Sequence, residues 1–257
     1  MKVVILAGGY GTRLSEETLL RPKPMVEIGE KPILWHIMKC FSFYGFNDFI
    51  ILCGYKGHVI KDFFINYAYL SSDITVDIAR NEVEFHDVKS PPWKVTLIET
   101  GLNTMTGGRI RYAKDYVGES DFFLTYGDGL ANIDFSKLVS FHRAHGKLAT
   151  VTAVTPPGRF GALDLDGDSV RRFVEKPLGD GGYINGGFFI LNPEIFKLLT
   201  SDKDVWEREP VSSLAESRQL VAFKHRGFFQ PMDTARDKEL LENLWRDGNA
   251  PWKIWID

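Results

Sequence analysis

The sequence predicts an α/β fold: a Rossmann-like, open, mixed but mainly parallel sheet flanked by helices. Two short apolar runs, at residues 3–6 and 48–53, are typical of strands buried on both faces of a parallel sheet. Apolar residues also recur at helical spacing over residues 32–43 and 59–67. This alternation of strand and helix predicts βαβ units, whose right-handed crossovers place successive strands parallel in one sheet.

The rest of the chain continues the alternation. Residues 74–99 are rich in strand patterns, and residues 122–126 and 149–154 are predicted strands. A helix is expected within residues 130–147. The short aromatic tail, residues 251–256, is expected to pack on the body or on a partner subunit.

Composition narrows the class of protein. The 257 residues suit one domain, and an apolar content of 44% is enough for a sizeable core. A net charge of −3 provides no overall basic field, so we expect no nucleic-acid partner. The apolar runs are shorter than a bilayer span and the N-terminus has no signal-peptide pattern, so we expect no membrane partner and a cytoplasmic location. Cys40 and Cys53 lack metal-ligand spacing and are expected to be reduced core thiols.

The most informative stretch follows the first strand and reads Leu6-Ala7-Gly8-Gly9-Tyr10-Gly11-Thr12-Arg13-Leu14. Three glycines within four positions let a ligand approach the main chain, whose N–H groups suit phosphate. Arg13 adds a forked cation. Lys23 lies between Pro22 and Pro24, which are expected to hold it in an extended segment. These features together predict a site for a polyanion.

Two common glycine-loop motifs fit this stretch poorly. A dinucleotide fingerprint needs a third glycine where the chain has Leu14, and a P-loop needs glycine followed by Lys and Ser/Thr, which does not occur. A nicotinamide-dependent oxidoreductase therefore stays open as a disfavoured alternative. A tight turn that binds no ligand is the other alternative.

The glycine loop followed by Pro22-Lys23-Pro24-Met25 resembles the signature of the sugar-1-phosphate nucleotidyltransferases, and the resemblance extends over nearly the whole chain. It implies the fold of the nucleotide-diphospho-sugar transferases in a single domain, residues 1–257. Residues 1–130 would form mainly the nucleotide-binding half, residues 131–240 mainly the sugar-phosphate half, and residues 241–257 a C-terminal tail. It also implies that the loop from Leu6 to Thr12 wraps the nucleotide, and that Arg13 and Lys23 are catalytic contacts to its phosphates.

Residues 100–109 have the composition of a loop that ends at a double glycine beside Arg109, with a helix after it. They could be a surface loop or a second wall of the nucleotide pocket. The run Thr104-Met105-Thr106-Gly107-Gly108-Arg109 resembles the cytidylyltransferase branch of the family, which implies CTP and glucose 1-phosphate as partners. It also implies that Thr104 and Arg109 contact the nucleotide. UTP or dTTP remains an alternative, because backbone groups can read cytosine and uracil alike.

Two aromatic strand patterns each deliver an aspartate, through Phe122-Phe123-Leu124-Thr125-Tyr126-Gly127-Asp128 and Phe228-Phe229-Gln230-Pro231-Met232-Asp233. Ligands bind beyond the carboxyl ends of such strands, where an aspartate can hold Mg²⁺ against a phosphate. Asp128 could instead bond its own turn, and Asp233-Thr234 could be a helix N-cap. The resemblance implies that Asp128 and Asp233 are the Mg²⁺ ligands and that Gly127 contacts the nucleotide.

Glu175-Lys176-Pro177 and Asn185-Gly186-Gly187 are the candidates for sugar binding. Hexose hydroxyls need carboxylate and amide partners, which Glu175 and Asn185 supply, and Lys176 can meet the sugar phosphate. A strand-exit turn and a glycine bend are the alternatives. The resemblance implies that Glu175, Lys176, Asn185 and Gly186 bind the sugar 1-phosphate.

The sequence therefore predicts an enzyme that transfers a nucleotidyl group with Mg²⁺ as cofactor. Relatives in the family are homo-oligomers as a rule, so a homo-oligomer is expected. A non-catalytic nucleotide-sugar sensor is the alternative from another class, and the presence together of Arg13, Lys23 and the two aspartates argues against it.

Overall fold

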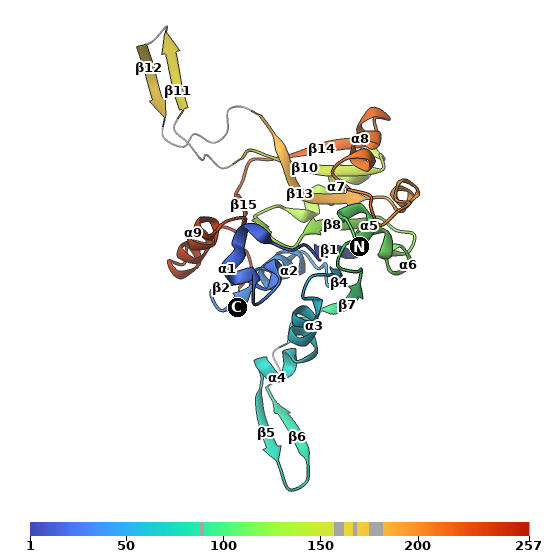
Figure 1. The fold of residues 1–257 in the computed structure, drawn as a ribbon, viewed down its shortest axis with the longest axis vertical. Coiled ribbons are helices and arrows are strands. Elements are labelled where there is room, and N and C mark those ends of the chain that lie inside the picture. Colours follow the sequence, from blue (N-terminus) through green and yellow to red (C-terminus); the bar gives the residue numbers. More distant parts are fainter. Residues whose placement is uncertain (88–89, 157–161, 167–168, 175–181, 257) are drawn as a thin grey trace.

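The computed structural model describes residues 1–87, 90–156, 162–166, 169–174 and 182–256. Within these residues, seven strands form one sheet in the order β14-β10-β13-β8-β1-β4-β7 (Figure 1). Their bounds are β1 Val3–Ala7, β4 Asp48–Cys53, β7 Lys94–Glu99, β8 Phe122–Tyr126, β10 Ala149–Val154, β13 Ile184–Leu191 and β14 Leu220–His225. Strand β13 runs antiparallel to β8 and β10, whereas the other neighbours pair in parallel. The predicted mixed, mainly parallel sheet is confirmed.

Helices cover both faces of this sheet (Figure 1), and strand β1 shows why. Its residues are all buried, and successive side chains point to opposite faces. Val3 and Ile5 join an apolar cluster with helices α2 (Ile33–Phe43) and α7 (Phe135–His145). Val4 and Leu6 join a second cluster with α5 (Thr106–Tyr112), α6 (Lys114–Val117) and α8 (Glu209–Glu216). A strand covered on both faces must be apolar throughout, as its sequence is.

The remaining elements connect or extend these layers. The helical ones are η1 Thr12–Leu14, α1 Ser15–Thr18, η2 Lys23–Met25, α3 Gly57–Ile65, α4 Tyr67–Ser71, η3 Pro193–Leu198 and α9 Ala235–Arg246. Four two-stranded ladders are β2 (Glu27–Ile28) with β3 (Lys31–Pro32), β5 (Asp73–Asp77) with β6 (Glu82–His86), β9 (Gly129–Ala131) with β15 (Phe229–Pro231), and β11 (Ala162–Asp166) with β12 (Ser169–Val174), all among the described residues. The hairpin β5–β6 projects from the body beyond α4 (Figure 1).

The predicted loop over residues 100–109 is correct only as far as Met105, because helix α5 begins at Thr106. Glycine is a poor helix former, which is why composition favoured a loop. The two glycines are needed for close packing: a Cβ on Gly107 would lie 2.8 Å from the carbonyl oxygen of Asp204, and one on Gly108 would lie 2.6 Å from Cα of Asp202. The N–H of Gly108 also donates to Asp204, so tertiary contacts stabilise the first turn.

The C-terminal tail and the two cysteines follow the expectations. The aromatic tail packs on the body, with Trp252 buried against His36 and Trp255 against Trp35. Cys40 and Cys53 are buried free thiols. No helix in the described ranges is long and apolar enough to cross a membrane. The division of the chain at residues 130 and 240 stays a prediction, and α9 runs across the second of these points.

Candidate active site

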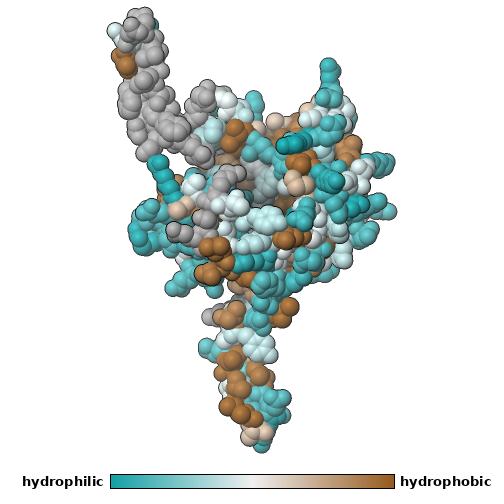
Figure 2. All heavy atoms as spheres, in the orientation of Figure 1, coloured by the Kyte–Doolittle hydropathy of each residue, from teal (hydrophilic) through white to brown (hydrophobic). Residues whose placement is uncertain are grey.

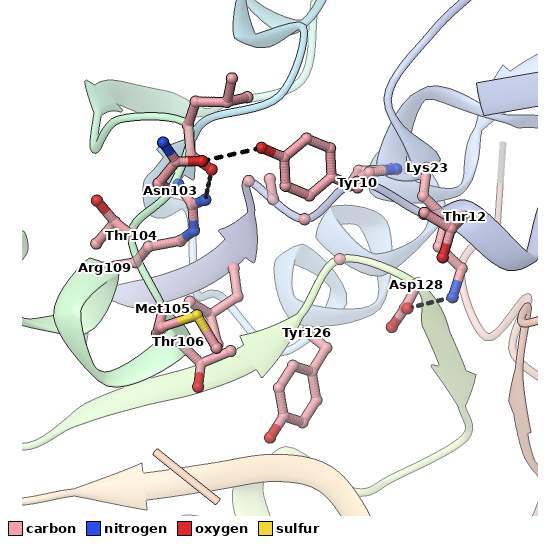
Figure 3. A pocket seen from close by; sticks show the side chains of 18 of the residues that line it. Tyr10, Thr12, Lys23, Asn103, Thr104, Met105, Thr106, Arg109, Tyr126 and Asp128 are labelled. Carbon is pink, nitrogen blue, oxygen red and sulfur yellow. Dashed lines mark hydrogen bonds and ion pairs between the residues drawn. The ribbon is translucent and has the colours of Figure 1, made fainter. Parts of the chain in front are cut away.

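A cavity of about 510 Å³ opens beyond the carboxyl ends of β1 and β8 (Figure 3). The loop after β1 forms its floor, and the segment before α5 forms the facing wall. Most of the predicted nucleotide contacts line this cavity, namely Leu6, Ala7, Gly8, Gly9, Tyr10, Gly11, Thr12, Lys23, Thr104, Arg109 and Gly127, together with Asp128 and Asp233. The side chain of Arg13 lies outside the part of the chain that the structure describes. The predicted nucleotide contacts whose side chains the structure describes are thus gathered around one cavity, together with the two predicted metal ligands.

The three glycines of the loop differ in whether the folded structure requires glycine at their positions. Gly8 is required by Arg109, because a Cβ on Gly8 would overlap the guanidinium. Gly11 has a φ of 64°, in the left-handed region that favours glycine. A Cβ on Gly9 would meet no protein atom within 4 Å, and its φ is not positive. Packing in the described structure therefore does not require glycine at Gly9, whereas a ligand lying against the backbone would.

Arg109 is buried, with 5% of its surface exposed, and its guanidinium is bonded to the wall of the cavity. Nη1 donates to the hydroxyl of Thr100 at 2.5 Å and to the carbonyl of Gly101 at 2.7 Å, and Nη2 donates to the carbonyl of Leu102 at 3.3 Å. Burial lowers the pKa of Arg109, although Glu99 acts against this shift. In this state Arg109 shapes the wall, and its predicted contact with the nucleotide stays a proposal.

Lys23, Asp128 and Asp233 form an ion-pair triad at the edge of the cavity, and Figure 3 shows the pair of Lys23 with Asp128. The Lys23 ammonium lies 2.6 Å from Oδ2 of Asp128 and 2.7 Å from Oδ1 of Asp233. The side chain of Lys23 is 12% exposed, and those of the aspartates are 30% and 24% exposed. Burial acts to lower the pKa of Lys23, but the two carboxylates outweigh it and raise the pKa above its ordinary value. The lysine is therefore a cation that the two aspartates share.

The expected extended conformation at Lys23 is wrong, because Lys23–Met25 is a turn of 3₁₀-helix. Pro22 is extended and begins the turn, and the N–H groups of Met25 and Val26 then donate to the carbonyls of Pro22 and Lys23. The fixed φ of Pro24 is compatible with a 3₁₀ turn as well as with an extended chain. The turn directs Lys23 at the aspartates.

The β9–β15 ladder explains how Asp128 and Asp233 converge. Gly129 pairs with Pro231, and the N–H of Met232 donates to the carbonyl of Asp128 at 2.8 Å. The N-cap alternative is also realised, but by Thr234, which forms a capping box with Asp237 at the start of α9. Asp233 precedes the cap and reaches Lys23. One local sequence thus supplies both a helix start and a site carboxylate.

The donor set fits a small divalent cation. Two carboxylates that share one ammonium can also share one metal ion, and Mg²⁺ is held as a rule by one or two carboxylates with waters and substrate phosphates. No group of three or more His, Cys, Asp or Glu side chains that could hold a metal ion occurs among the described residues. The residues present therefore suit a metal ion that arrives with a phosphate ligand rather than an all-protein cage.

A second cavity, of about 440 Å³, lies on the other side of the triad. Asn185 and Gly186 line it, as expected for the sugar side, whereas Glu175 and Lys176 lie outside the described residues. The side-chain oxygen of Asn185 accepts from the N–H of Gly187 at 2.8 Å, at a bulge in β13. Among the described residues, Tyr126, Asp128 and Asp233 line both cavities. The two hollows therefore meet at the triad.

Sequence reasoning placed Tyr10 in the nucleotide loop but missed its side-chain partners, and it did not assign Tyr126 to the site. The hydroxyl of Tyr10 donates to Oδ1 of Asn103 at 3.2 Å, across the mouth of the first cavity (Figure 3), and its ring lies 5.3 Å from that of Tyr55. Tyr126 separates the two cavities. A tyrosine between loop glycines or at a strand end was a weak signal, because its partners are distant in sequence.

The fold and this site define a nucleotidyltransferase. A family model described as "Nucleotidyl transferase" matches residues 2–247, so the chain belongs to that family. Members of the family typically use a divalent metal. The glucose-1-phosphate cytidylyltransferases of Salmonella typhi and Salmonella typhimurium are each 58% identical to this chain over 256 residues, which is 99% of this chain and 100% of theirs.

Solved structures agree with this assignment. HddC from Yersinia pseudotuberculosis, in complex with GMP-PN, superposes with a TM-score of 0.70 at 28% identity and covers 95% of this chain and 99% of its own. A putative glucose-1-phosphate thymidylyltransferase from Bacillus anthracis has a TM-score of 0.71 at 18% identity, with 96% of each chain covered, which shows the fold alone. The predicted nucleotide-diphospho-sugar transferase fold is confirmed.

Proposed function

We propose that this chain joins CTP to α-D-glucose 1-phosphate and releases CDP-glucose and pyrophosphate. The observation that carries the proposal is the 58% identity, over the full length of both chains, with the two Salmonella glucose-1-phosphate cytidylyltransferases. The arrangement of the site supports it, because two cavities, one per substrate, meet at a cluster of one cation and two carboxylates.

The reaction is an in-line displacement. An oxygen of the sugar phosphate attacks the α-phosphorus of CTP, and the bond to the leaving pyrophosphate breaks. A phosphate monoester is already anionic near pH 7, so no general base is needed. Catalysis is then mainly positioning and stabilisation of charge. This agrees with the position of His36, which is fully buried in the core and hydrogen-bonded to the Ile28 carbonyl, away from either cavity.

The nucleotide would occupy the larger cavity, with its phosphates along Gly8, Gly9 and Gly11. Lys23 directs two of its N–H donors at the aspartates. When those carboxylates hold a metal ion instead, the ammonium would donate to an oxygen of the α-phosphate. Arg13 would hold the β- and γ-phosphates as the charge on the leaving group grows. Thr104 and Arg109 would complete the wall on the nucleoside side.

Asp128 and Asp233 would hold Mg²⁺, which supplies charge neutralisation between the α- and leaving phosphates when bound. On the other side, Asn185 and Gly186 would receive the hexose with Glu175, and Lys176 would orient the nucleophilic phosphate. The position of the triad between the two cavities supports this division of roles.

A homo-oligomer in the cytoplasm is part of the proposal. The β5–β6 hairpin carries exposed apolar side chains along one side (Figure 2), among them Ile74, Val76 and Val83, whose fractional exposures are 41%, 54% and 42%. A two-stranded hairpin with an uncovered apolar face is marginally stable in water, which favours its burial against a second copy. Analytical sedimentation tests this proposal. The wild type is expected to sediment as an oligomer, and Val76→Glu is expected to sediment as a smaller species.

The experiment that tests the reaction is pyrophosphate release with glucose 1-phosphate and Mg²⁺, run in parallel with CTP, UTP, dTTP, ATP and GTP. Preference for CTP is expected. Preference for UTP or dTTP would overturn the base assignment and leave the class intact. If no pyrophosphate is released with any of the five nucleotides but CDP-glucose raises the Tm, a nucleotide-sugar sensor would be favoured instead.

A further inference from the structure

Tyr126, the last residue of β8, is the residue beside the triad that faces both cavities. It lies two residues before Asp128, at the point where the sugar phosphate must approach the α-phosphorus if the proposed function holds. Figure 3 shows its ring at the border of the first cavity, and the same residue lines the second cavity, so the ring forms part of the partition between them. The position of this ring therefore affects how closely and at what angle the two substrates meet.

A carboxylate outside both cavities holds the phenol. The hydroxyl of Tyr126 donates to Oε1 of Glu207 at 2.5 Å, and the hydroxyl of Thr106 donates to Oε2 of the same carboxylate at 2.6 Å. The N–H of Trp206 in turn donates to the Thr106 hydroxyl at 2.9 Å. Hydrogen bonds from hydroxyls to a carboxylate are short and strong. Glu207 thereby ties the partition to the first turn of α5, in the wall of the nucleotide cavity.

The sugar side holds the other edge of the ring. Gly187 has a φ of 78°, and a Cβ there would lie 2.6 Å from Cδ2 of Tyr126, so the ring occupies space that only glycine leaves. Asn185, which lines the sugar cavity, is itself fixed beside this glycine, because its side-chain oxygen accepts from the N–H of Gly187.

We propose that Tyr126 contacts the hexose as the wall between the substrates, and that Glu207 is a positioning residue that acts through Tyr126 and Thr106. This inference rests on the proposed function. An aromatic face presents apolar surface to the C–H groups of a sugar ring, while its edge is fixed by Gly187 and its hydroxyl by Glu207. The wall then limits the approach of the sugar phosphate to one direction.

The test is steady-state kinetics with each substrate varied in turn. Tyr126→Leu is expected to raise the KM for glucose 1-phosphate about tenfold or more, and to change the KM for CTP less than about threefold. Tyr126→Phe, which keeps the ring, is expected to lower kcat more than it raises either KM. Glu207→Ala is expected to resemble Tyr126→Phe, with partial rescue by Glu207→Gln, whose amide oxygen can still accept a hydrogen bond. Glu209→Ala, an exposed change at the start of α8, is the matched control.

A KM for glucose 1-phosphate within twofold of wild type in Tyr126→Leu would overturn the inference. Equal changes in both KM values accompanied by a fall in Tm would also overturn it, because they would indicate a merely structural role. Glu207→Ala kinetics identical to those of Glu209→Ala would remove Glu207 as the positioning residue. Failure of the proposed function gives a different result, since the wild type would then release no pyrophosphate from CTP.

Discussion

Replacing Lys23 by methionine should make the nucleotide-free protein bind a divalent cation more tightly while it lowers turnover. Methionine keeps an unbranched side chain of similar length but removes the ammonium that lies 2.6 Å from Asp128 and 2.7 Å from Asp233. In the wild type a metal ion must compete with this ammonium for the same two carboxylates. In Lys23→Met this ammonium no longer offsets the repulsion between the two carboxylates.

The magnitude follows from the two hydrogen bonds. A hydrogen bond to a charged group contributes about 1.5–3 kcal/mol. The carboxylates are 30% and 24% exposed, so water compensates part of the loss, and we count one bond rather than two. Since about 1.4 kcal/mol is a factor of ten, the affinity for Mn²⁺ should rise roughly 10- to 100-fold. Turnover should fall by roughly 10²-fold or more, the scale of losing one charge-stabilising donor.

The assay is calorimetric titration of Mn²⁺ into the nucleotide-free protein, paired with pyrophosphate release. Lys61→Met is the matched control, because Lys61 pairs with Glu99 at 3.0 Å and lines neither cavity. An unchanged or weaker Mn²⁺ affinity in Lys23→Met would refute the competition between lysine and metal. Near-normal turnover would refute the catalytic role of Lys23.

The remaining predictions concern the glycine loop, the metal and the core histidine. Gly8→Ala should lower the Tm, because its Cβ would clash with Arg109. Gly9→Ala should leave the Tm unchanged and raise the KM for CTP. Equal Tm values for the two variants would contradict this prediction. Asp128→Asn should raise the Mg²⁺ concentration for half-maximal rate roughly tenfold, and an identical magnesium titration would remove Asp128 from the site. Burial lowers the pKa of His36 from 6.5 to about 4. Between pH 6.5 and 4 the unfolded chain therefore binds more protons than the folded protein does. The free energy of unfolding should then decrease as the pH falls through this range. The fall is about 3 kcal/mol at most, and urea unfolding of His36→Gln should show a flatter pH profile.

The local sequence was sufficient to predict many of the strands and helices of the fold. Strands β1, β4 and β8 are continuous apolar runs because the sheet is covered on both faces, and that pattern is visible without the structure. Helix α2 was predicted to within one residue from its apolar spacing. The start of α5 was not, because the contacts of Gly107 and Gly108 with the segment after η3 override a low helix propensity.

Some residues of the candidate site could likewise be predicted from the sequence, whereas others became apparent only in the structure. The glycine loop, Lys23 and the two aspartates were visible as residue types at strand ends, where an α/β sheet binds ligands. Their resemblance to a family motif assigned roles that neither periodicity nor composition contains. Tyr126, Glu207 and the Tyr10–Asn103 contact had no such signal, since each depends on partners tens of residues away.

By itself, the sequence determined the elements, the parallel character of the sheet and the chemical types at the strand ends, because these depend on neighbours along the chain. Tertiary structure decided which of them meet. Lys23 contacts Asp128, 105 positions away, and Asp233, 210 positions away. The β9–β15 ladder brings the two aspartates together. The guanidinium of Arg109 packs against both Gly8 and Gly54, and the sequence alone does not indicate this contact for either glycine. Such convergence is set by strand order and by close packing, which no local pattern of residues records.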